Sequence, residues 1–225
     1  MSLTVRVISV LNNSDLSNSL WQEINKLLPE NYLYKANKFR FWKDKQAYVL
    51  GKLLTKNILQ TTTNKDLEDV QYTEFNKPYV NDTLSFNVSH SGEYVVCAYC
   101  ISNTQLGIDV EQIDNRTRIE DFDLVLTASE KKKIYNSATP KSDFYTLWTL
   151  KEAVVKADGR GLNIPLQEIE ILEDKIAVNE KNWYYHSLLI DNNYKCHLVA
   201  DEEKIEIVMN KVTVEELVSK LLQKA

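Results

Sequence analysis

The chain has 225 residues, of which 44% are hydrophobic and 26% charged, and this composition predicts a packed core and excludes an intrinsically disordered chain. Its net charge of -5 lacks the positive field that non-specific nucleic-acid binding requires, so nucleic acid is not expected as a partner. The longest apolar run, residues 94–101, is far shorter than the roughly 20 residues that span a bilayer, and residues 1–11 lack the features of a signal peptide, so we expect a cytoplasmic protein without membrane association.

Hydrophobic periodicity and turn residues predict helices and short strands along the whole chain. In the first half we expect a strand over 3–11, helices over 16–28 and 32–60, and strands over 70–75, 84–89 and 94–101. In the second half we expect a strand over 106–111, helices over 119–126, 129–136 and 142–157, strands over 169–178, 183–189, 194–200 and 205–208, and a helix over 214–222. Helices followed by antiparallel strands occur twice, which predicts an α+β protein with two lobes, residues 1–103 and 104–225.

The three cysteines are an odd number and too few to cross-link a chain of this length, which is typical of a reducing compartment. Cys97 and Cys100 have the C-x-x-C spacing of redox and zinc sites. They lie in the predicted buried strand 94–101, where residues three apart point to opposite faces. Two thiols that point apart cannot share a metal, so we favour two core cysteines.

A first chemical motif is G-I-D-V-E, from Gly107 to Glu111. On a strand, Asp109 and Glu111 project together from one face, while Ile108 and Val110 point into the core. Two neighbouring carboxylates repel each other, and a hard divalent cation such as Mg²⁺ removes this repulsion. The alternative is an edge strand with a solvated acidic face.

A second motif places Glu152 and Lys156 four residues apart, so they share one face of the predicted helix 142–157. The pair could be a surface ion pair worth roughly a few tenths of a kcal/mol. Alternatively, Glu152 is a third metal ligand and Lys156 contacts phosphate oxygens bound to the same metal.

A third motif is Ser89-His90, at the end of the predicted strand 84–89. A hydrolytic triad is not expected, because adjacent residues rarely have the required geometry and the chain contains no G-x-S-x-G segment. Either the two side chains bind a phosphate or nucleotide, or they form a turn in which the histidine is satisfied by hydrogen bonds.

Three segments together carry a resemblance to a known family: N-V-S-H-S from Asn87, G-I-D-V-E from Gly107, and W-x-x-K-E-A-x-x-K-x-x-G-x-G-L from Trp148. In this order they resemble the 4′-phosphopantetheinyl transferases, specifically the larger monomeric Sfp type. The resemblance implies two α+β lobes related by pseudo-twofold symmetry, each a small antiparallel sheet packed with helices. It also implies transfer of the 4′-phosphopantetheine arm of coenzyme A to a serine of an apo acyl or peptidyl carrier protein, with release of 3′,5′-ADP.

The resemblance further implies roles for individual residues around a cleft between the lobes. Asp109, Glu111 and Glu152 would hold Mg²⁺ on the diphosphate of coenzyme A. Lys156 would contact the phosphates, and Glu130 falls where the family has a glutamate proposed as the base that accepts the serine proton.

By the same resemblance, the nucleotide end of coenzyme A would contact Lys35, Lys77, Pro78, Ser89 and His90. Ser89 and His90 would bind the 3′-phosphate end, and Lys77-Pro78 would lie near adenine. Asn76 replaces the glycine that is usual before this pair, and the helix near Ala47 lacks an arginine that some relatives carry.

Two other functions fit the same residues. A Mg²⁺-dependent phosphohydrolase could use the three carboxylates to activate water. A non-catalytic interaction protein could carry them as solvated faces. For a carrier partner, which is commonly acidic around its modified serine, residues 131–133 form a candidate basic surface, the alternative being an ordinary exposed helix face.

Overall fold

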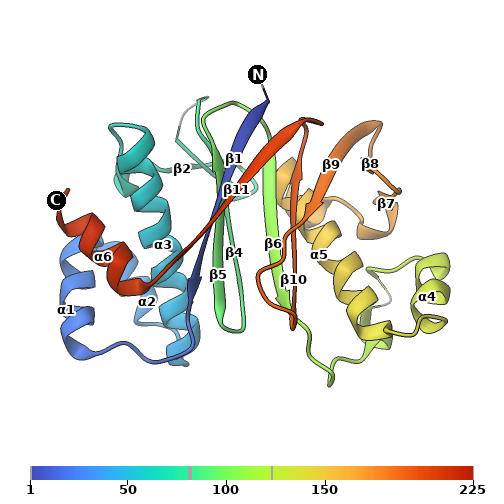
Figure 1. Cartoon of the computed structure of the whole chain (residues 1–225), viewed down its shortest axis with the longest axis horizontal. Coiled ribbons are helices and arrows are strands. Elements are labelled where there is room, and N and C mark those ends of the chain that lie inside the picture. The colour runs from blue at the N-terminus through green and yellow to red at the C-terminus, as the bar shows by residue number, and fades with distance from the viewer. Residues whose placement is uncertain (1, 81–82, 123, 225) are drawn as a thin grey trace.

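The computed structural model of the chain describes residues 2–80, 83–122 and 124–224. The chain forms two lobes side by side, each with one long helix packed against a small sheet (Figure 1). The predicted α+β class is therefore confirmed.

The N-terminal sheet has the strand order β11-β1-β5-β4, with β1 at Leu3–Leu11, β4 at Ser85–Ser91, β5 at Tyr94–Cys100 and β11 at Ile205–Val212. Its helices are α1 (Asn18–Leu27), α2 (Glu30–Ala36), α3 (Trp42–Thr62) and α6 (Val214–Leu222). A 3₁₀ turn at Leu67–Asp69 and the short strands β2 (Gln71–Tyr72) and β3 (Pro78–Tyr79) connect α3 to β4.

The C-terminal sheet has the order β6-β10-β9-β8-β7, with β6 at Leu106–Gln112, β7 at Glu170–Ile171, β8 at Ile176–Val178, β9 at Lys181–Ser187 and β10 at Tyr194–Ala200. Helix α5 (Pro140–Asp158) packs on this sheet, and α4 (Ala128–Tyr135) packs on α5. The remaining elements are 3₁₀ turns at Ile119–Phe122, Gly161–Asn163 and Leu166–Glu168.

The elements stack as helices, sheet, sheet, helices across the molecule (Figure 1). One core lies between the N-terminal helices and their sheet, a second between the two sheets, and a third between the C-terminal sheet and α5. Cys97 lies in the first core and Cys100 in the second, so the two thiols point to opposite faces of β5, as predicted. Among the described helices, none is long and apolar enough to cross a membrane.

The end of the chain departs from the predicted division at residue 103. Strand β11 pairs in parallel with β1, and α6 buries Leu217, Val218 and Leu221 in the core of the N-terminal lobe. The N-terminal sheet is consequently mixed rather than purely antiparallel. The physical reason is that β1 would otherwise present an unpaired edge and α1 and α3 an uncovered apolar face.

Four predicted segments differ from the structure locally. The helix expected over 32–60 is broken at residues 37–41, where the chain turns after Asn37, a weak helix former, before α3 starts at Trp42. Of the helix expected over 119–126, residues 119–122 form a 3₁₀ turn and 124–126 belong to no helix, while residue 123 lies outside the described residues. The strand expected over 70–75 is reduced to β2 at Gln71–Tyr72, and the strand expected over 169–178 is the hairpin of β7 and β8.

Where the lobes meet, β4 lies beside β6 and bonds it through side chains. Every second residue of β4 is polar, so three side chains point to the same neighbour and accept hydrogen bonds from backbone N–H groups of β6. The bonded pairs are Asn87 with Ile108 (2.9 Å), Ser89 with Val110 (3.4 Å) and Ser91 with Gln112 (3.1 Å). The N-V-S-H-S segment thus joins the two sheets.

Candidate active site

The two carboxylates of β6 project from one face of the strand, as predicted, and the serines of β4 hold them in place. Ser89 donates to Asp109 Oδ1 at 2.9 Å, and Ser91 donates to Glu111 Oε2 at 2.6 Å. Trp148 Nε1 on α5 donates to Glu111 Oε1 at 3.4 Å. Asp109 is nearly fully buried, at 3% exposed. The acidic pair is therefore part of the lobe junction rather than a solvated strand face.

Helix α5 supplies the second half of the site. Lys156 Nζ donates to Asp109 Oδ1 at 2.6 Å and to Ser89 Oγ at 2.9 Å. Glycine at 107 permits this approach, because a Cβ there would lie 2.2 Å from the carbonyl oxygen of Ala153. The glycine of G-I-D-V-E thus lets α5 lie directly on β6.

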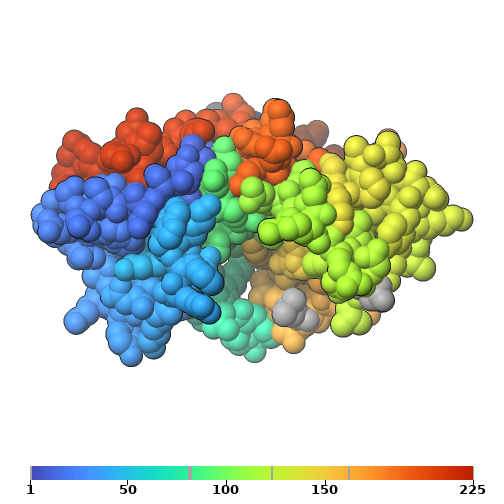
Figure 2. Space-filling view, turned by 90° about the horizontal axis from the view of Figure 1, so that it is seen from below, coloured from blue at the N-terminus to red at the C-terminus, as the bar shows by residue number. Residues whose placement is uncertain are grey.

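One hollow of about 250 Å³ between the lobes collects the residues of the three motifs. Its lining consists of Val88, Ser89, His90, Asp109, Glu111, Trp148, Glu152 and Lys156. Segments that are more than 60 residues apart in the sequence therefore share one site. The space-filling view from below shows a depression in the middle of the molecule, between the light-blue segment on one side and the C-terminal lobe on the other (Figure 2).

The carboxylates of this hollow repel one another. Burial raises the pKa of Glu111, and the charge of Asp109 adds to the rise. Burial also raises the pKa of Glu152, with the charges of Asp109 and Glu111 acting in the same direction. Such a cluster favours a bound cation.

Two observations bear on whether the carboxylates of this hollow are already arranged to bind a metal ion. Asp109 Oδ2 is buried and has no hydrogen-bond partner, which is consistent with an oxygen that coordinates a cation when one is bound. Within the described residues, however, no three acidic, histidine or cysteine side chains already form a ligand set, and Lys156 neutralises Asp109 instead. The donor chemistry fits Mg²⁺, while the side chains have to adjust to bind it.

Two further hollows continue along β4. A hollow of about 190 Å³ shares Val88 and His90 with the acidic hollow and is also lined by Tyr48, Lys52 and Pro78. The largest one, of about 590 Å³, shares Pro78 and Phe86 with this second hollow and is lined by Lys77. Of the predicted nucleotide residues, Lys77, Pro78 and His90 therefore line the hollows next to the acidic one, whereas Ser89 lines only the acidic hollow and Lys35 lines none of the three.

Lys77 lines the hollow of about 590 Å³, whereas Lys35 lies near Tyr48, which lines the hollow of about 190 Å³. Lys35 Nζ lies 5.5 Å from the centre of the Tyr48 ring. Lys77 Nζ donates to the carbonyl oxygen of Ala157 at 2.5 Å and so bridges the lobes. Asn76, which replaces the family's glycine, has a left-handed φ of 63°, a conformation that glycine adopts freely and asparagine tolerates.

Glu130, like Lys35, is a predicted site residue that does not line any of these hollows. Its Oε2 accepts from the backbone N–H of Thr127 at 2.8 Å and from Lys151 Nζ at 2.9 Å. Lys151 is fully buried and also donates to the carbonyl oxygens of Val125 and Leu166. The structure therefore places Glu130 in the packing of α4 on α5, away from the acidic hollow.

Sequence reasoning missed three contributors: Asn87, Ser91 and Lys52. Asn87 and Ser91 repeat at two-residue intervals around Ser89, and this spacing was a usable signal for a shared strand face. Lys52 lies in the interior of a long helix, and nothing local in the sequence distinguishes it.

Two family models match the chain and together cover most of it. The model described as "4′-phosphopantetheinyl transferase, N-terminal" matches residues 15–102, and the "4′-phosphopantetheinyl transferase superfamily" model matches residues 105–208. The second match contains the acidic residues of β6 together with α5. The chain therefore belongs to the 4′-phosphopantetheinyl transferase superfamily.

Similar curated proteins support the Sfp type within this superfamily. The chain is 36% identical over 138 residues to 4′-phosphopantetheinyl transferase gsp of Aneurinibacillus migulanus. The matched region covers 57% of this chain and 55% of that protein. It is 26% identical over 203 residues to 4′-phosphopantetheinyl transferase Sfp of Bacillus subtilis (strain 168), covering 81% and 86%. A solved structure of Thermotoga maritima holo-[acyl-carrier-protein] synthase has 27% identity and a TM-score of 0.34, covering 43% of this chain and 61% of that chain.

Proposed function

We propose that the chain is a 4′-phosphopantetheinyl transferase that moves the phosphopantetheine arm of coenzyme A to a serine of an apo acyl or peptidyl carrier protein. The observation that carries this proposal is the single hollow that combines Ser89 and His90 of β4, the carboxylates of β6, and Glu152 and Lys156 of α5. The names of gsp and Sfp support the same activity. Because both walls of the hollow come from one chain, a monomer is sufficient.

Asp109, Glu111 and Glu152 are the residues that would hold Mg²⁺. The mutual repulsion of these carboxylates and the unpartnered Oδ2 of Asp109 support this assignment. When bound, the metal would neutralise negative charge on the diphosphate of coenzyme A. Lys156 pairs with Asp109 in the structure. Once the metal neutralises Asp109, the Lys156 ammonium would be available to bind phosphate oxygens instead.

The proposed reaction is a phosphoryl-type transfer. The serine oxygen of the carrier forms a bond to the phosphorus that bears the pantetheine arm, and the bond from this phosphorus to 3′,5′-ADP breaks. The serine proton passes to a carboxylate oxygen of the hollow that the metal would leave free, and this oxygen accepts it as the new bond forms.

The remaining hollows along β4 would bind the nucleotide. An elongated ligand with its diphosphate in the acidic hollow reaches His90 and Pro78 next, and then Lys77. Lys35 and His90 would contact its 3′-phosphate. Coenzyme A, which joins a diphosphate to a phosphorylated nucleoside, has this distribution of charge.

The test is to incubate the protein with coenzyme A, Mg²⁺ and a small panel of apo carrier proteins, and to measure the mass of each carrier. We expect one carrier to gain the mass of phosphopantetheine while 3′,5′-ADP appears, and a metal chelator to stop both. Free phosphate without a mass gain would support the phosphohydrolase instead. Absence of coenzyme A binding by calorimetry at saturating Mg²⁺ would favour the non-catalytic interaction protein.

A further inference from the structure

The turn between α2 and α3 exposes an unusual number of aromatic side chains. Four aromatic residues within nine positions are exposed: Tyr34 (65%), Phe39 (39%), Phe41 (59%) and Trp42 (38%). Clustered exposed aromatic side chains are typical of protein interfaces, where such residues supply most of the binding energy. We refer to residues 34–43 as the aromatic turn.

The aromatic turn is also strongly basic, although the whole chain is acidic. Residues 34–43 contain four lysines and arginines and no acidic residue, in a chain of net charge -5. Basic side chains of the turn lie over aromatic rings: Lys38 is 4.3 Å from the centre of Tyr34, and Arg40 is 5.2 Å from the centre of Phe41. Of the basic residues in this segment, Lys43 alone has a carboxylate partner within the described part of the chain, Glu93 at 3.7 Å. The charge of Lys38 and Arg40 is thus uncompensated and available to an anionic partner.

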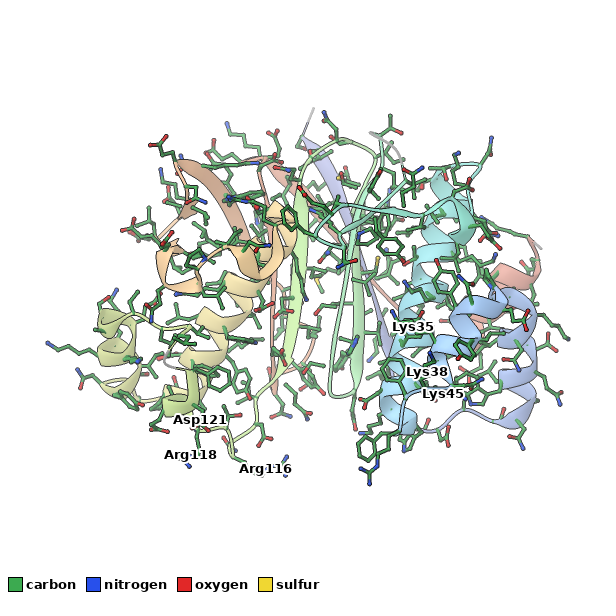
Figure 3. The ribbon with its side chains drawn as sticks, turned by 180° about the vertical axis from the view of Figure 1, so that it is seen from behind. Lys35, Lys38, Lys45, Arg116, Arg118 and Asp121 are labelled. Carbon is green, nitrogen blue, oxygen red and sulfur yellow. The ribbon has the colours of Figure 1, made fainter. Side chains whose placement is uncertain are left out.

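The aromatic turn lies at the edge of the proposed active site. Asn12 donates to the carbonyl oxygen of Lys43 at 2.9 Å, and the backbone of Asn12 donates to Glu93 at 2.8 Å. Glu93 belongs to the β4–β5 turn, two residues after Ser91, which holds Glu111. Seen from behind, Lys38 lies in the lower part of the N-terminal lobe, and Arg116 and Arg118 lie at the lower end of the C-terminal lobe (Figure 3). Seen from below, this light-blue segment borders the central depression (Figure 2).

A protein that places a serine in the acidic hollow has to rest on the rim of that hollow. We propose that the aromatic turn is the docking surface for an acidic carrier protein, with Arg40 and Lys38 against its carboxylates and Phe41 and Trp42 against its apolar side chains. This inference rests on the proposed function. It favours the aromatic turn over the basic residues 131–133, because α4 lies at the outer edge of the C-terminal lobe, far from the rim (Figure 1).

An anionic membrane is the other occupant that aromatic and basic residues could bind, and the structure favours it less. Membrane-surface segments are typically continuous amphipathic helices, whereas residues 37–41 form a turn between two helices. In addition, the net charge of -5 would oppose approach to an anionic bilayer, while a local basic patch is enough to bind a protein with a matching acidic patch.

The test compares Arg40→Glu and Phe41→Ser with the control Lys132→Glu/Lys133→Glu, whose positions are exposed on α4. For each variant the KM for the apo carrier, the KM for coenzyme A, and direct carrier binding without coenzyme A are measured. In both turn variants we expect the KM and Kd for the carrier to rise roughly tenfold while the KM for coenzyme A stays unchanged. In the control we expect none of these three values to change. Unchanged thermal unfolding confirms that each variant folds.

Several outcomes would overturn the docking proposal. Unchanged carrier binding in both turn variants would contradict it. Weakened carrier binding that occurs only in the α4 control or only in Arg118→Glu would also contradict it, because these residues would place the carrier on the C-terminal lobe. Binding of the wild type to phosphatidylserine vesicles that Arg40→Glu abolishes, with an unchanged carrier KM, would make the turn a membrane contact. Carrier binding without any transfer would contradict the proposed function but leave the docking surface supported.

Discussion

At the scale of single residues, Glu152 decides whether the acidic hollow acts as a metal site. Replacing it with glutamine keeps its volume and removes the charge, so a Mg²⁺ site would lose one of three anionic ligands. We expect Glu152→Gln to lower transfer at least about 100-fold, because even residues that only support a metal ligand contribute roughly 10- to 100-fold. The measurement is kcat/KM as a function of Mg²⁺ concentration.

Cys97→Ala is the control for this experiment, because Cys97 is buried in the core between the helices and the N-terminal sheet, outside the hollow. We expect its kcat to stay close to that of the wild type. Near-normal turnover of Glu152→Gln at limiting Mg²⁺ would show that Glu152 is not a metal ligand.

Lys52 is a residue for which the hollow next to His90 makes a separate prediction. Its Nζ lies 5.1 Å from the Tyr32 ring and 5.5 Å from the Tyr48 ring, while Lys35 lies at the same distance from Tyr48. Both lysines therefore lie near the Tyr48 ring, in the part of the helix that lacks the arginine of some relatives. If Lys52 contacts the 3′-phosphate, Lys52→Met should raise the KM for coenzyme A about five- to tenfold, in line with the roughly 1 kcal/mol of a partly exposed charged hydrogen bond.

The matched substrate is coenzyme A without the 3′-phosphate, and the matched variant is Lys26→Met, an exposed lysine of α1 that pairs with Glu23. We expect Lys52→Met to leave the KM for the dephosphorylated substrate unchanged, and Lys26→Met to change neither value. An equal loss with both substrates would mean that Lys52 acts on a different part of the ligand.

At the scale of secondary-structure elements, the contact between α4 and α5 depends on a buried ion pair. Lys151 is fully buried, and Glu130 supplies its only carboxylate among the described residues. Glu130→Ala leaves this ammonium without a counter-charge, and such a loss typically costs about 3–5 kcal/mol. We expect a corresponding decrease in the free energy of unfolding, measured with urea, and a kcat near that of the wild type at low temperature.

Glu216→Ala is a closely matched control. Glu216 closes the same type of capping box, with Thr213 at the start of α6, but no buried lysine pairs with it among the described residues. It should cost only about 1 kcal/mol. A hundredfold lower kcat in folded Glu130→Ala would instead restore the role of base that the family resemblance implies.

How much the sequence could predict also differs between elements. Helices with clear ends and strands with strong apolar alternation, such as α6 and β10, are found within one or two residues, because their signal is local. The break at residues 37–41 escaped prediction because periodicity continues across it. The pairing of β11 with β1 joins residues about 200 positions apart in the sequence, so no local pattern could show it.

At the scale of the whole molecule, the site depends on how two lobes of one chain are held together. The three motifs predicted that Asp109, Glu111, Glu152 and Lys156 act together, and the structure places them in one hollow. The surroundings of this hollow could not be predicted, because they depend on contacts between lobes: the side-chain bonds from β4 to β6, and Lys77 bonded to Ala157. Glu130 matched the family's proposed base by its position in the sequence alone, and in the structure it pairs with Lys151 of α5.

Lys77 makes this contact between the lobes sensitive to pH. Burial lowers its pKa to about 8, against a smaller opposing effect of Asp158. Below pH 8 the side chain is an ammonium that can contact a phosphorylated nucleotide, and above pH 8 it is increasingly a neutral amine. Because a neutral amine attracts a phosphate far less, we expect the KM for coenzyme A to rise as the pH increases from 7 to 9.5.

Lys77→Arg isolates this effect, because a guanidinium stays charged throughout the range. We expect the rise in KM to disappear in Lys77→Arg, whereas Lys77→Met should bind coenzyme A weakly at every pH. The measurement is the KM for coenzyme A at half-unit pH intervals, with the carrier saturating. An identical rise in wild type and Lys77→Arg would assign the pH dependence to another group and remove Lys77 from the nucleotide site.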